Sequence, residues 1–153
     1  MKEIFGNIWD YHKQGDWIAI TTNGTVKSNG ECVMGRGVAK QAKMLYPELP
    51  SDLGTLIKLQ GNYLYLFSKY KIITFPVKYN WHEKASIKLI EQSAKELVDA
   101  YEIINYPKKL NFNVYLVRPG CGNGQLNWEE VKPILGKYLD DHFIIVEINT
   151  NQN

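Results

Sequence analysis

The chain has 153 residues, of which 44% are hydrophobic and 22% charged, and its formal net charge is +2. This length is typical of one domain with a sizeable core, so we expect a single domain over residues 1–149 and a short tail over 150–153. No run approaches the roughly 18 apolar residues of a membrane-spanning helix. The first residues lack the apolar core of a signal peptide, which predicts a cytoplasmic protein with no membrane contact.

Charge, cysteines and histidines limit the chemistry further. A net charge of +2 is too small to predict a nucleic-acid groove by itself. Cys32 and Cys121 have no metal-ligand or redox spacing, and a disulfide between them is not expected in a reducing compartment. His12, His82 and His142 also lack metal-ligand spacing. We therefore expect no metal site. We also expect a monomer that uses no cofactor.

The predicted elements alternate between strands and helices. Segments rich in Ile, Val, Tyr and Phe predict strands, and apolar residues that recur every three or four positions predict helices. Ser86 is placed as an N-cap, and Asn127 and Glu130 are placed as a capping box. In chain order we expect a strand over 3–9, a strand over 17–22, helices over 37–45 and 49–59, strands over 63–68 and 71–75, a helix over 86–103, a strand over 113–117, a helix over 127–138 and a strand over 143–148.

This alternation predicts a three-layer α/β/α fold with a central mixed, mostly parallel sheet. Several strands are near-continuous apolar runs, which is typical of a sheet covered on both faces. Ligands of such folds bind beyond the carboxyl ends of the strands. Two glycine loops and the segment after Phe75 are expected at such ends.

The first glycine loop opens directly into the helix expected over 37–45, and residues 34–42 read MGRGVAKQA. Glycine lets the backbone approach a ligand, and the unpaired N–H groups of a helix start favour phosphates. The loop lacks the third glycine of a dinucleotide fingerprint and the Gly-Lys-Ser/Thr of a Walker A loop. Thr21, Thr22, Asn23 and Asn29 add polar side chains for sugar hydroxyls. The alternative is a tight turn without a ligand.

The second glycine loop carries three glycines in five residues: Gly120, Gly122 and Gly124. Each glycine costs conformational entropy on folding, so a simple turn explains this density poorly. Successive N–H groups in such a loop can form an anion-binding nest. The pattern favours a ligand loop.

A third segment, FPVKYNWH over 75–82, leaves an apolar strand and leads to the helix that Ser86 starts. Lys78 could act there as an electrophile stabiliser or, with a lowered pKa, as a nucleophile. Tyr79 and Trp81 could stack on a ring. Taken singly, each of these residues is more often part of a surface or of side-chain packing. Acyl transfer is not expected, because the chain has no Gly-x-Ser-x-Gly elbow and no Cys/His arrangement.

Together these segments resemble the macrodomains, which are ADP-ribose-binding α/β/α modules. Residues 29–41 (NGECVMGRGVAKQ) resemble their first ligand loop, and residues 120–128 (GCGNGQLNW) resemble their phosphate-gripping second loop. The resemblance spans nearly the whole chain, from FGNI over 5–8 to the last strand. The chain is most similar to the subgroup of terminal ADP-ribose glycohydrolases and DNA ADP-ribosyl glycohydrolase antitoxins, in which a lysine in a Phe-Pro-x-Lys context ahead of a Trp is implicated in catalysis.

The resemblance implies that Lys78 is the catalytic residue. It also implies that the first loop and the second loop hold the diphosphate, and that Asn29 and Asn23 fix the distal ribose. The residues implied to contact ADP-ribose are Asn7, Ile8, Asn23, Asn29, Met34, Gly35, Gly37, Val38, Ala39, Trp81, Pro119, Gly120, Cys121, Gly122, Asn123 and Gly124.

The chain departs from the family pattern at two places. Some members carry a catalytic aspartate in the second loop, where this chain has Gly124, whereas antitoxin-like members also have glycine there. The insertion over 25–28 lengthens the first loop and changes what reaches the distal ribose.

The implied function is hydrolysis of ADP-ribose from a modified macromolecule, either nucleic acid or protein. Two alternatives stay open: a non-catalytic ADP-ribose- or nucleotide-binding module, and a phosphatase for ADP-ribose 1″-phosphate. The expected partners are ADP-ribose or an ADP-ribosylated macromolecule. For a nucleic-acid substrate, lysines at the pocket rim such as Lys69, Lys84 and Lys88 would meet the phosphate backbone.

Overall fold

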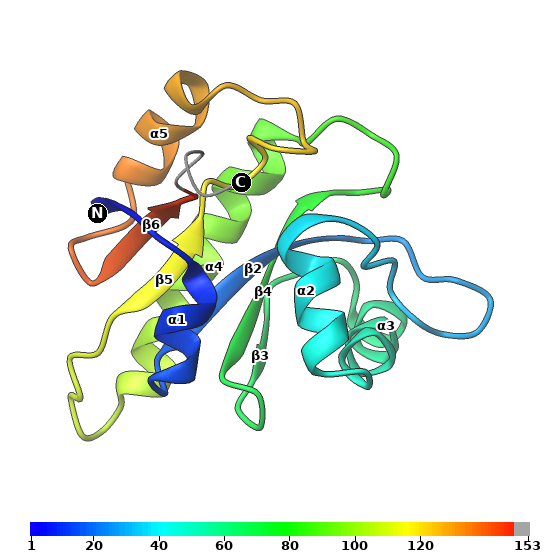
Figure 1. The fold of residues 1–153 in the computed structure, drawn as a ribbon, viewed down its shortest axis with the longest axis horizontal. Helices are drawn as coiled ribbons and strands as arrows, with labels where there is room; N and C mark the ends of the chain where they lie inside the picture. Colours follow the sequence, from blue (N-terminus) through cyan, green and yellow to red (C-terminus); the bar gives the residue numbers. More distant parts are fainter. Residues whose placement is uncertain (149–153) are drawn as a thin grey trace.

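The computed structural model of the protein describes residues 1–148, and the predicted tail over 150–153 lies outside the described residues. In this part of the chain, strands form one sheet and helices cover both of its faces (Figure 1). The strands are β1 (Lys2–Phe5), β2 (Trp17–Asn23), β3 (Tyr65–Phe67), β4 (Ile72–Lys78), β5 (Val114–Val117) and β6 (Phe143–Glu147). The helices are α1 (Ile8–Lys13), α2 (Gly37–Leu45), α3 (Leu49–Gln60), α4 (Ile87–Asn105) and α5 (Trp128–Gly136).

The sheet has the strand order β1-β6-β5-β2-β4-β3. All neighbouring strands run parallel except β3, which pairs antiparallel with β4 at one edge. The prediction of a three-layer α/β/α fold with a mixed, mostly parallel sheet is confirmed. This order places the carboxyl ends of β5, β2 and β4 side by side, where three loops leave the sheet.

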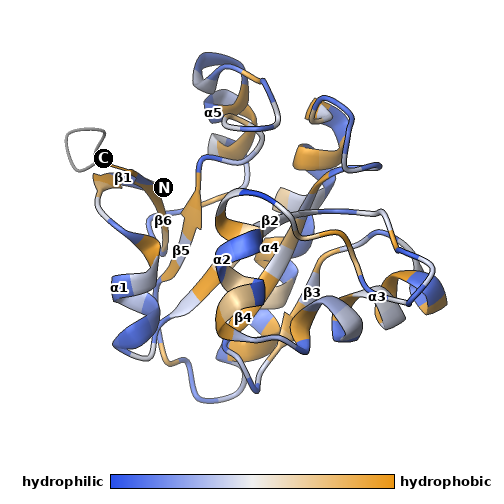
Figure 2. Ribbon diagram, turned by 45° about the vertical axis from the view of Figure 1, so that its right-hand side comes forward, coloured by the Kyte–Doolittle hydropathy of each residue, from blue (hydrophilic) through white to orange (hydrophobic). Residues whose placement is uncertain are grey.

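Two apolar cores lie on the two faces of the sheet. Along β2, Ile18 and Ile20 pack into one core and Ala19 into the other, because successive side chains of a strand point to opposite faces. The first core holds α1, α2 and α3 against the sheet, and the second holds α4 and α5. The strands are strongly apolar and the helices carry their apolar residues on one side (Figure 2). Burial on both faces explains the continuous apolar strands.

The predicted strand over 3–9 is wrong beyond Phe5. Asn7 stops the strand, because its side chain accepts a hydrogen bond from the main-chain N–H of Trp9 at 3.0 Å and caps α1. Ile8 and Trp9 then bury their side chains against the sheet as part of a helix. Consecutive apolar residues over a short stretch do not distinguish a strand from a buried helix start.

The strand predicted over 71–75 extends further and ends at Lys78. Pro76 lies inside it, opposite Thr22, where the pairing with β2 shifts register between Thr22 and Asn23. A proline has no N–H for the ladder and is tolerated at such an irregularity. As a result, Lys78 is the last residue of a buried strand, which holds its main chain firmly.

The helix boundaries were predicted well except at one cap. The helix over 37–45 is confirmed, and Ser86 caps α4 by accepting a hydrogen bond from the N–H of Leu89 at 3.2 Å. The capping box at α5 is wrong. Asn127 makes no capping hydrogen bond and instead donates from its side chain to the Glu130 carboxylate at 3.5 Å.

Candidate functional site

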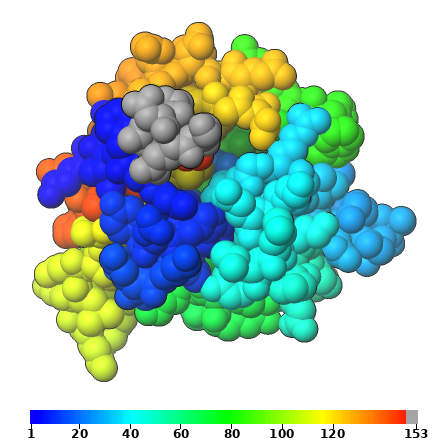
Figure 3. All heavy atoms as spheres, viewed as in Figure 1, coloured from blue at the N-terminus to red at the C-terminus, as the bar shows by residue number. Residues whose placement is uncertain are grey.

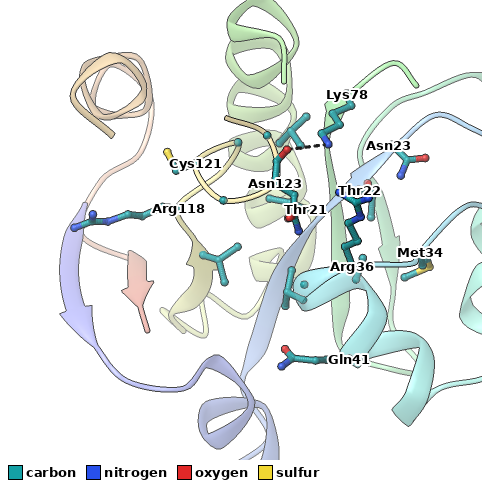
Figure 4. A pocket seen from close by; sticks show the side chains of 18 of the residues that line it. Thr21, Thr22, Asn23, Met34, Arg36, Gln41, Lys78, Arg118, Cys121 and Asn123 are labelled. Carbon is teal, nitrogen blue, oxygen red and sulfur yellow. Dashed lines mark hydrogen bonds between the residues drawn. The ribbon is translucent and has the colours of Figure 1, made fainter. Parts of the chain in front are cut away.

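The loops that follow β2, β4 and β5 enclose one cavity with a volume of about 990 Å³. Figure 3 shows the surface hollowed between the cyan segment, which contains α2, and the yellow segment that follows β5. Side chains from β2, from the start of α2, from the end of β4 and from the second glycine loop converge there (Figure 4). The cavity therefore lies at the carboxyl edge of the sheet, where such folds bind ligands.

Most of the residues predicted from the sequence line this cavity. They are Lys78, Asn7, Ile8, Asn23, Met34, Gly35, Gly37, Val38, Ala39, Trp81, Gly120, Cys121, Gly122, Asn123 and Gly124. Pro119 is buried and does not line the cavity.

Asn29 does not line the cavity either, so the structure does not support its predicted contact with a ribose. Its side chain accepts from the N–H of Glu31 at 3.0 Å and donates to the Glu31 carboxylate at 3.2 Å, in an exposed turn. Asn23 does line the cavity. Its amide is already used to hold the first loop, donating to the main-chain oxygen of Val33 at 2.9 Å and accepting from the N–H of Thr25 at 3.0 Å.

The first glycine loop ends at the start of α2. Arg36 is the N-cap and makes no side-chain capping bond, and Gly37 has a φ of +57°. The main-chain N–H groups of Gly37, Val38 and Ala39 donate to no acceptor among residues 1–148. Unpaired donors and the positive end of a nine-residue helix therefore face the cavity.

The second glycine loop is held in shape by its own main chain. The N–H of Leu126 donates to Gly120 at 2.9 Å, and the N–H of Gln125 donates to Gly122 at 3.1 Å. The N–H groups of Gly122, Asn123 and Gly124 have no acceptor within residues 1–148. The two loops approach each other closely, since a Cβ on Gly37 would lie 3.5 Å from Nδ2 of Asn123. Two sets of free N–H donors thus line one space, as an anion site requires.

The charged side chains that line the cavity are mainly positive. Lys27, Arg36, Lys78 and Arg118 are basic, and Glu147 is acidic. The one negative charge in this set is already paired, because the Glu147 carboxylate accepts from Arg118 Nη2 at 2.7 Å. Figure 4 shows Arg118 pointing away from Lys78, and its guanidinium lies over the Trp128 ring at 5.0 Å. The unpaired positive charge therefore comes from the other three side chains and suits an anionic ligand.

Lys78 projects from the end of β4 toward the second glycine loop (Figure 4). Its Nζ donates to the main-chain oxygens of Asn123 at 3.2 Å and Trp81 at 3.3 Å. Partial burial lowers the pKa of the Lys78 amine below its ordinary value, and the nearby charge of Arg36 lowers that pKa further. No carboxylate within the described residues pairs with this amine.

The main chain of Lys78 is also anchored. Its carbonyl oxygen accepts from the N–H of Gly24 at 3.1 Å and from Nδ2 of Asn62 at 3.0 Å. A Cβ on Gly24 would lie 2.7 Å from the Asn62 side chain, so only glycine fits between these two segments. The main chain that carries the Lys78 side chain is therefore held in place at the end of β4.

Gly124, the position at which some macrodomains carry an aspartate, has no room for a side chain. A Cβ there would lie 2.5 Å from the oxygen of Gly120 and 2.8 Å from Cβ of Ala85. Its carbonyl accepts from the N–H of Ala85 at 3.0 Å, which fixes the loop against the start of α4. The packing around Gly124 thus excludes an aspartate at this position of the second loop.

Neither cysteine is an activated thiol. Burial raises the pKa of Cys32 to about 12 and raises the pKa of Cys121 above its ordinary value. Among residues 1–148 no cluster of three or more His, Cys, Asp or Glu side chains is suited to hold a metal ion. No helix in this range is long and apolar enough to cross a membrane.

The rim lysines are not all where the sequence suggested. The prediction that Lys69 lies at the pocket rim is wrong. Lys69 follows β3, just before the amino end of β4, and its Nζ pairs with the Asp52 carboxylate at 2.9 Å. It therefore lies at the opposite end of the strand from Lys78. Lys84 follows Lys78 and is exposed in the segment before α4, which keeps it on the cavity side of the sheet.

Several cavity residues were not predicted as ligand contacts. Two of them could have been predicted from their position in the sequence. Arg36 lies between the two glycines of the first loop, and Arg118 precedes the second glycine loop. The residues at the end of β6 could not have been predicted from the sequence, because only the sheet order places β6 beside β5. The unpredicted lining residues are Gly6, Thr25, Lys27, Val33, Arg36, Gln41, Val77, Val117, Arg118, Val146, Glu147 and Ile148.

Solved structures similar to this chain include the macrodomain of Mycobacterium tuberculosis DarG, with a TM-score of 0.72 and 23% identity over 94% of this chain and 96% of that one. Thermosipho africanus DarTG in complex with ADP-ribose has a TM-score of 0.71 and 21% identity, covering 99% of this chain and 42% of that one. The protein therefore has the macrodomain fold. No protein-family model matches the chain.

Within that fold, the protein is similar to the DarG macrodomains. Among curated proteins, the DNA ADP-ribosyl glycohydrolase of Mycobacterium tuberculosis (strain ATCC 25618 / H37Rv) is 30% identical over 131 residues, which is 77% of this chain and 35% of the relative. The chain thus spans about a third of the length of the curated relatives it matches. The resemblance predicted from the two glycine loops is confirmed.

Proposed function

We propose that this protein is an ADP-ribosyl glycohydrolase that hydrolyses ADP-ribose from modified DNA, with Lys78 as its catalytic residue. The position of Lys78 carries the proposal. Its amine contacts the second glycine loop and lies in the same cavity as two sets of unpaired N–H groups. The names of the relatives support the substrate, since the Mycobacterium tuberculosis protein is called a DNA ADP-ribosyl glycohydrolase.

The order of the strands suggests how ADP-ribose lies in the cavity. Ile8, Val117 and Val146 line the part near β1, β5 and β6, which suits the flat, largely apolar base. The two glycine loops at the centre supply N–H donors for the diphosphate. The distal ribose then lies on the β4 side of the cavity, next to Lys78. Thermosipho africanus DarTG, which has a similar fold, was solved in complex with ADP-ribose, and this supports ADP-ribose as the ligand.

The reaction breaks the bond between the anomeric carbon of the distal ribose and the atom that carries it. Water supplies a hydroxyl group to the carbon and a proton to the leaving group. Lys78 can contribute in two ways. As an ammonium it protonates the leaving group while positive charge builds on the sugar. As a neutral amine it attacks the anomeric carbon of the ring-opened sugar; the bond from that carbon to the leaving group breaks, an amine proton passes to that group, and water hydrolyses the resulting imine to ADP-ribose and the free amine.

The lowered pKa of Lys78 raises the fraction of neutral amine that attack needs, and it also makes the ammonium a stronger acid, so the direction of the shift suits both routes. The steric exclusion of a carboxylate at Gly124 is consistent with a mechanism that relies on a lysine without an aspartate in the second loop.

Calorimetric titration of free ADP-ribose, with AMP as the control, tests the binding part of the proposal. We expect micromolar binding that AMP does not match, because AMP cannot span both glycine loops. Release of ADP-ribose from an ADP-ribosylated DNA oligonucleotide then tests the reaction. Binding without release from DNA or protein would make the protein a recognition module, and phosphate release from ADP-ribose 1″-phosphate would make it a phosphatase. Either result contradicts the proposed function.

A further inference from the structure

On the Lys78 side, the cavity has a wall that neither the base nor the diphosphate uses in the proposed pose of ADP-ribose. It is made by Trp81 in the segment after β4 and by Lys27 in the inserted segment of the first loop, and both line the cavity. We call this pair the leaving-group rim. The main chain of Trp81 contacts Nζ of Lys78, and Lys27 lines the same cavity, so this rim faces the group that is attached to the distal ribose in the proposed pose.

Trp81 is held by its main chain, while its ring stays accessible. Its N–H donates to Oγ1 of Thr25 at 3.0 Å, and its carbonyl accepts from Nζ of Lys78 at 3.3 Å. The side chain is 47% exposed and meets the His82 ring edge-on, with centroids 5.5 Å apart. A half-exposed indole, on a residue whose main chain contacts the Lys78 amine, offers a surface for a flat ring.

Lys27 is placed by a small hairpin. Val26 bridges to Cys32, and the N–H of Lys27 donates to the oxygen of Glu31 at 2.8 Å. The hairpin is anchored on α3, where Pro50 accepts from the N–H of Cys32 at 2.9 Å. The Lys27 side chain is exposed and pairs with no carboxylate in the described residues. Its positive charge is therefore free for a ligand.

We infer that the leaving-group rim binds a nucleotide: the Trp81 ring stacks on the base that carries ADP-ribose, and the Lys27 ammonium contacts a neighbouring phosphate. This inference rests on the proposed function and adds the residues that select the leaving group. The reacting bond must lie near Nζ of Lys78, which places the departing group against Trp81. A nucleobase gains from stacking and its backbone gains from the lysine, whereas a modified protein has no nucleobase at this point and no neighbouring backbone phosphate.

Four single variants test the rim: Trp81→Ala and Lys27→Ala, with Tyr79→Ala and Lys43→Ala as matched controls. Tyr79 is an aromatic residue of the same segment with 51% exposure, and neither Tyr79 nor Lys43 lines the cavity. The measurements are KM for a single-stranded DNA oligonucleotide with one ADP-ribose on a base, and Kd for free ADP-ribose. Trp81→Phe is added because it keeps a ring and shows whether any loss comes from misfolding.

For Trp81→Ala we expect the ratio of oligonucleotide KM to ADP-ribose Kd to rise about 5- to 150-fold, as for the loss of one base stack. Trp81→Phe should recover most of the loss, and Tyr79→Ala should leave the ratio as in the parent protein. For Lys27→Ala, the slope of log KM against log salt concentration should fall by about 0.7, the value for one phosphate contact on a single strand. Lys43→Ala should keep the slope.

Two outcomes overturn this inference while the proposed function stands. One is a parent protein that cleaves the oligonucleotide, with the same ratio in Trp81→Ala as in Tyr79→Ala and an unchanged slope in Lys27→Ala. The other is an ADP-ribosylated protein substrate whose KM rises as much as that of the oligonucleotide when Trp81 is truncated. If the parent protein does not cleave the oligonucleotide at all, the proposed function itself fails.

Discussion

Nζ of Lys78 lies 3.2 Å from the main-chain oxygen of Asn123, so the end of β4 and the second glycine loop meet through one hydrogen bond (Figure 4). The two residues are 45 positions apart in the chain, and their contact places the amine beside the unpaired N–H groups of the loop. An anion held by those groups therefore brings its attached sugar within reach of the amine.

Replacement of Lys78 by alanine should lower kcat for ADP-ribose release by about 10²- to 10⁴-fold, the usual contribution of a positioned acid–base group. Single-turnover assays on an ADP-ribosylated oligonucleotide measure the effect. Lys58→Ala removes an exposed lysine of α3 outside the cavity and serves as the control, with kcat expected to be unchanged. Full turnover by Lys78→Ala would remove this residue from the mechanism.

Reduction by cyanoborohydride during turnover should separate the two roles of Lys78. The amine route passes through an imine between Nζ and the sugar, and hydride addition would convert this imine into a stable secondary amine. Mass spectrometry should then find ADP-ribose on the peptide that contains Lys78. If the reaction runs to completion in the reductant without a covalent adduct, the acid route is favoured.

The pH dependence of kcat should report the lowered pKa of Lys78. In the amine route the rate rises with pH, because more of the side chain is neutral, and it levels off above a pKa below the ordinary 10.5. In the acid route the sign is opposite, and the rate falls as pH passes that same pKa. Arg36→Gln removes the charge that adds to the shift, so it should move the inflection to higher pH. An inflection that does not move would exclude this coupling.

Gly124→Ala should destabilise the protein, because the new Cβ would lie 2.5 Å from the oxygen of Gly120. Overpacking of this kind typically costs about 1–3 kcal/mol, which corresponds to a fall in Tm of roughly 2–12 °C for a domain of this size. Gly122→Ala is the matched control within the same loop, since its Cβ would meet nothing within 4 Å. Thermal melts should show a lower Tm for the first variant alone; equal melts would contradict the steric argument.

Gly54→Ala tests whether the inserted segment of the first loop is held by α3. A Cβ on Gly54 would collide with the main-chain oxygen of Gly30, so the hairpin that carries Lys27 would have to move. We expect a Tm loss despite the better helix propensity of alanine. Gly136→Ala in α5 is the control, because its Cβ is unobstructed and the change should raise stability by up to about 1 kcal/mol. A Gly54→Ala protein that melts like the Gly136→Ala protein would show that the hairpin is not packed on α3.

The sequence by itself determined most of the segments that become strands and helices, that two glycine loops follow strands, and that Lys78 lies at a strand end. These features are local, since they depend on periodic apolar residues, capping side chains and the conformational freedom of glycine. Local signals failed where they were ambiguous, as at Ile8 and Trp9, whose apolar pair fits a strand as well as the start of α1.

Only the tertiary structure decided which side chains share the cavity. The sheet order places β6 beside β5, which brings Glu147 to the site, and it leaves Lys69 at the other end of β4. Packing between distant segments excludes a side chain at Gly124, and a local turn keeps Asn29 away from the cavity. Such relations depend on distances between residues far apart in the chain, and those distances are set when both faces of the sheet are buried together.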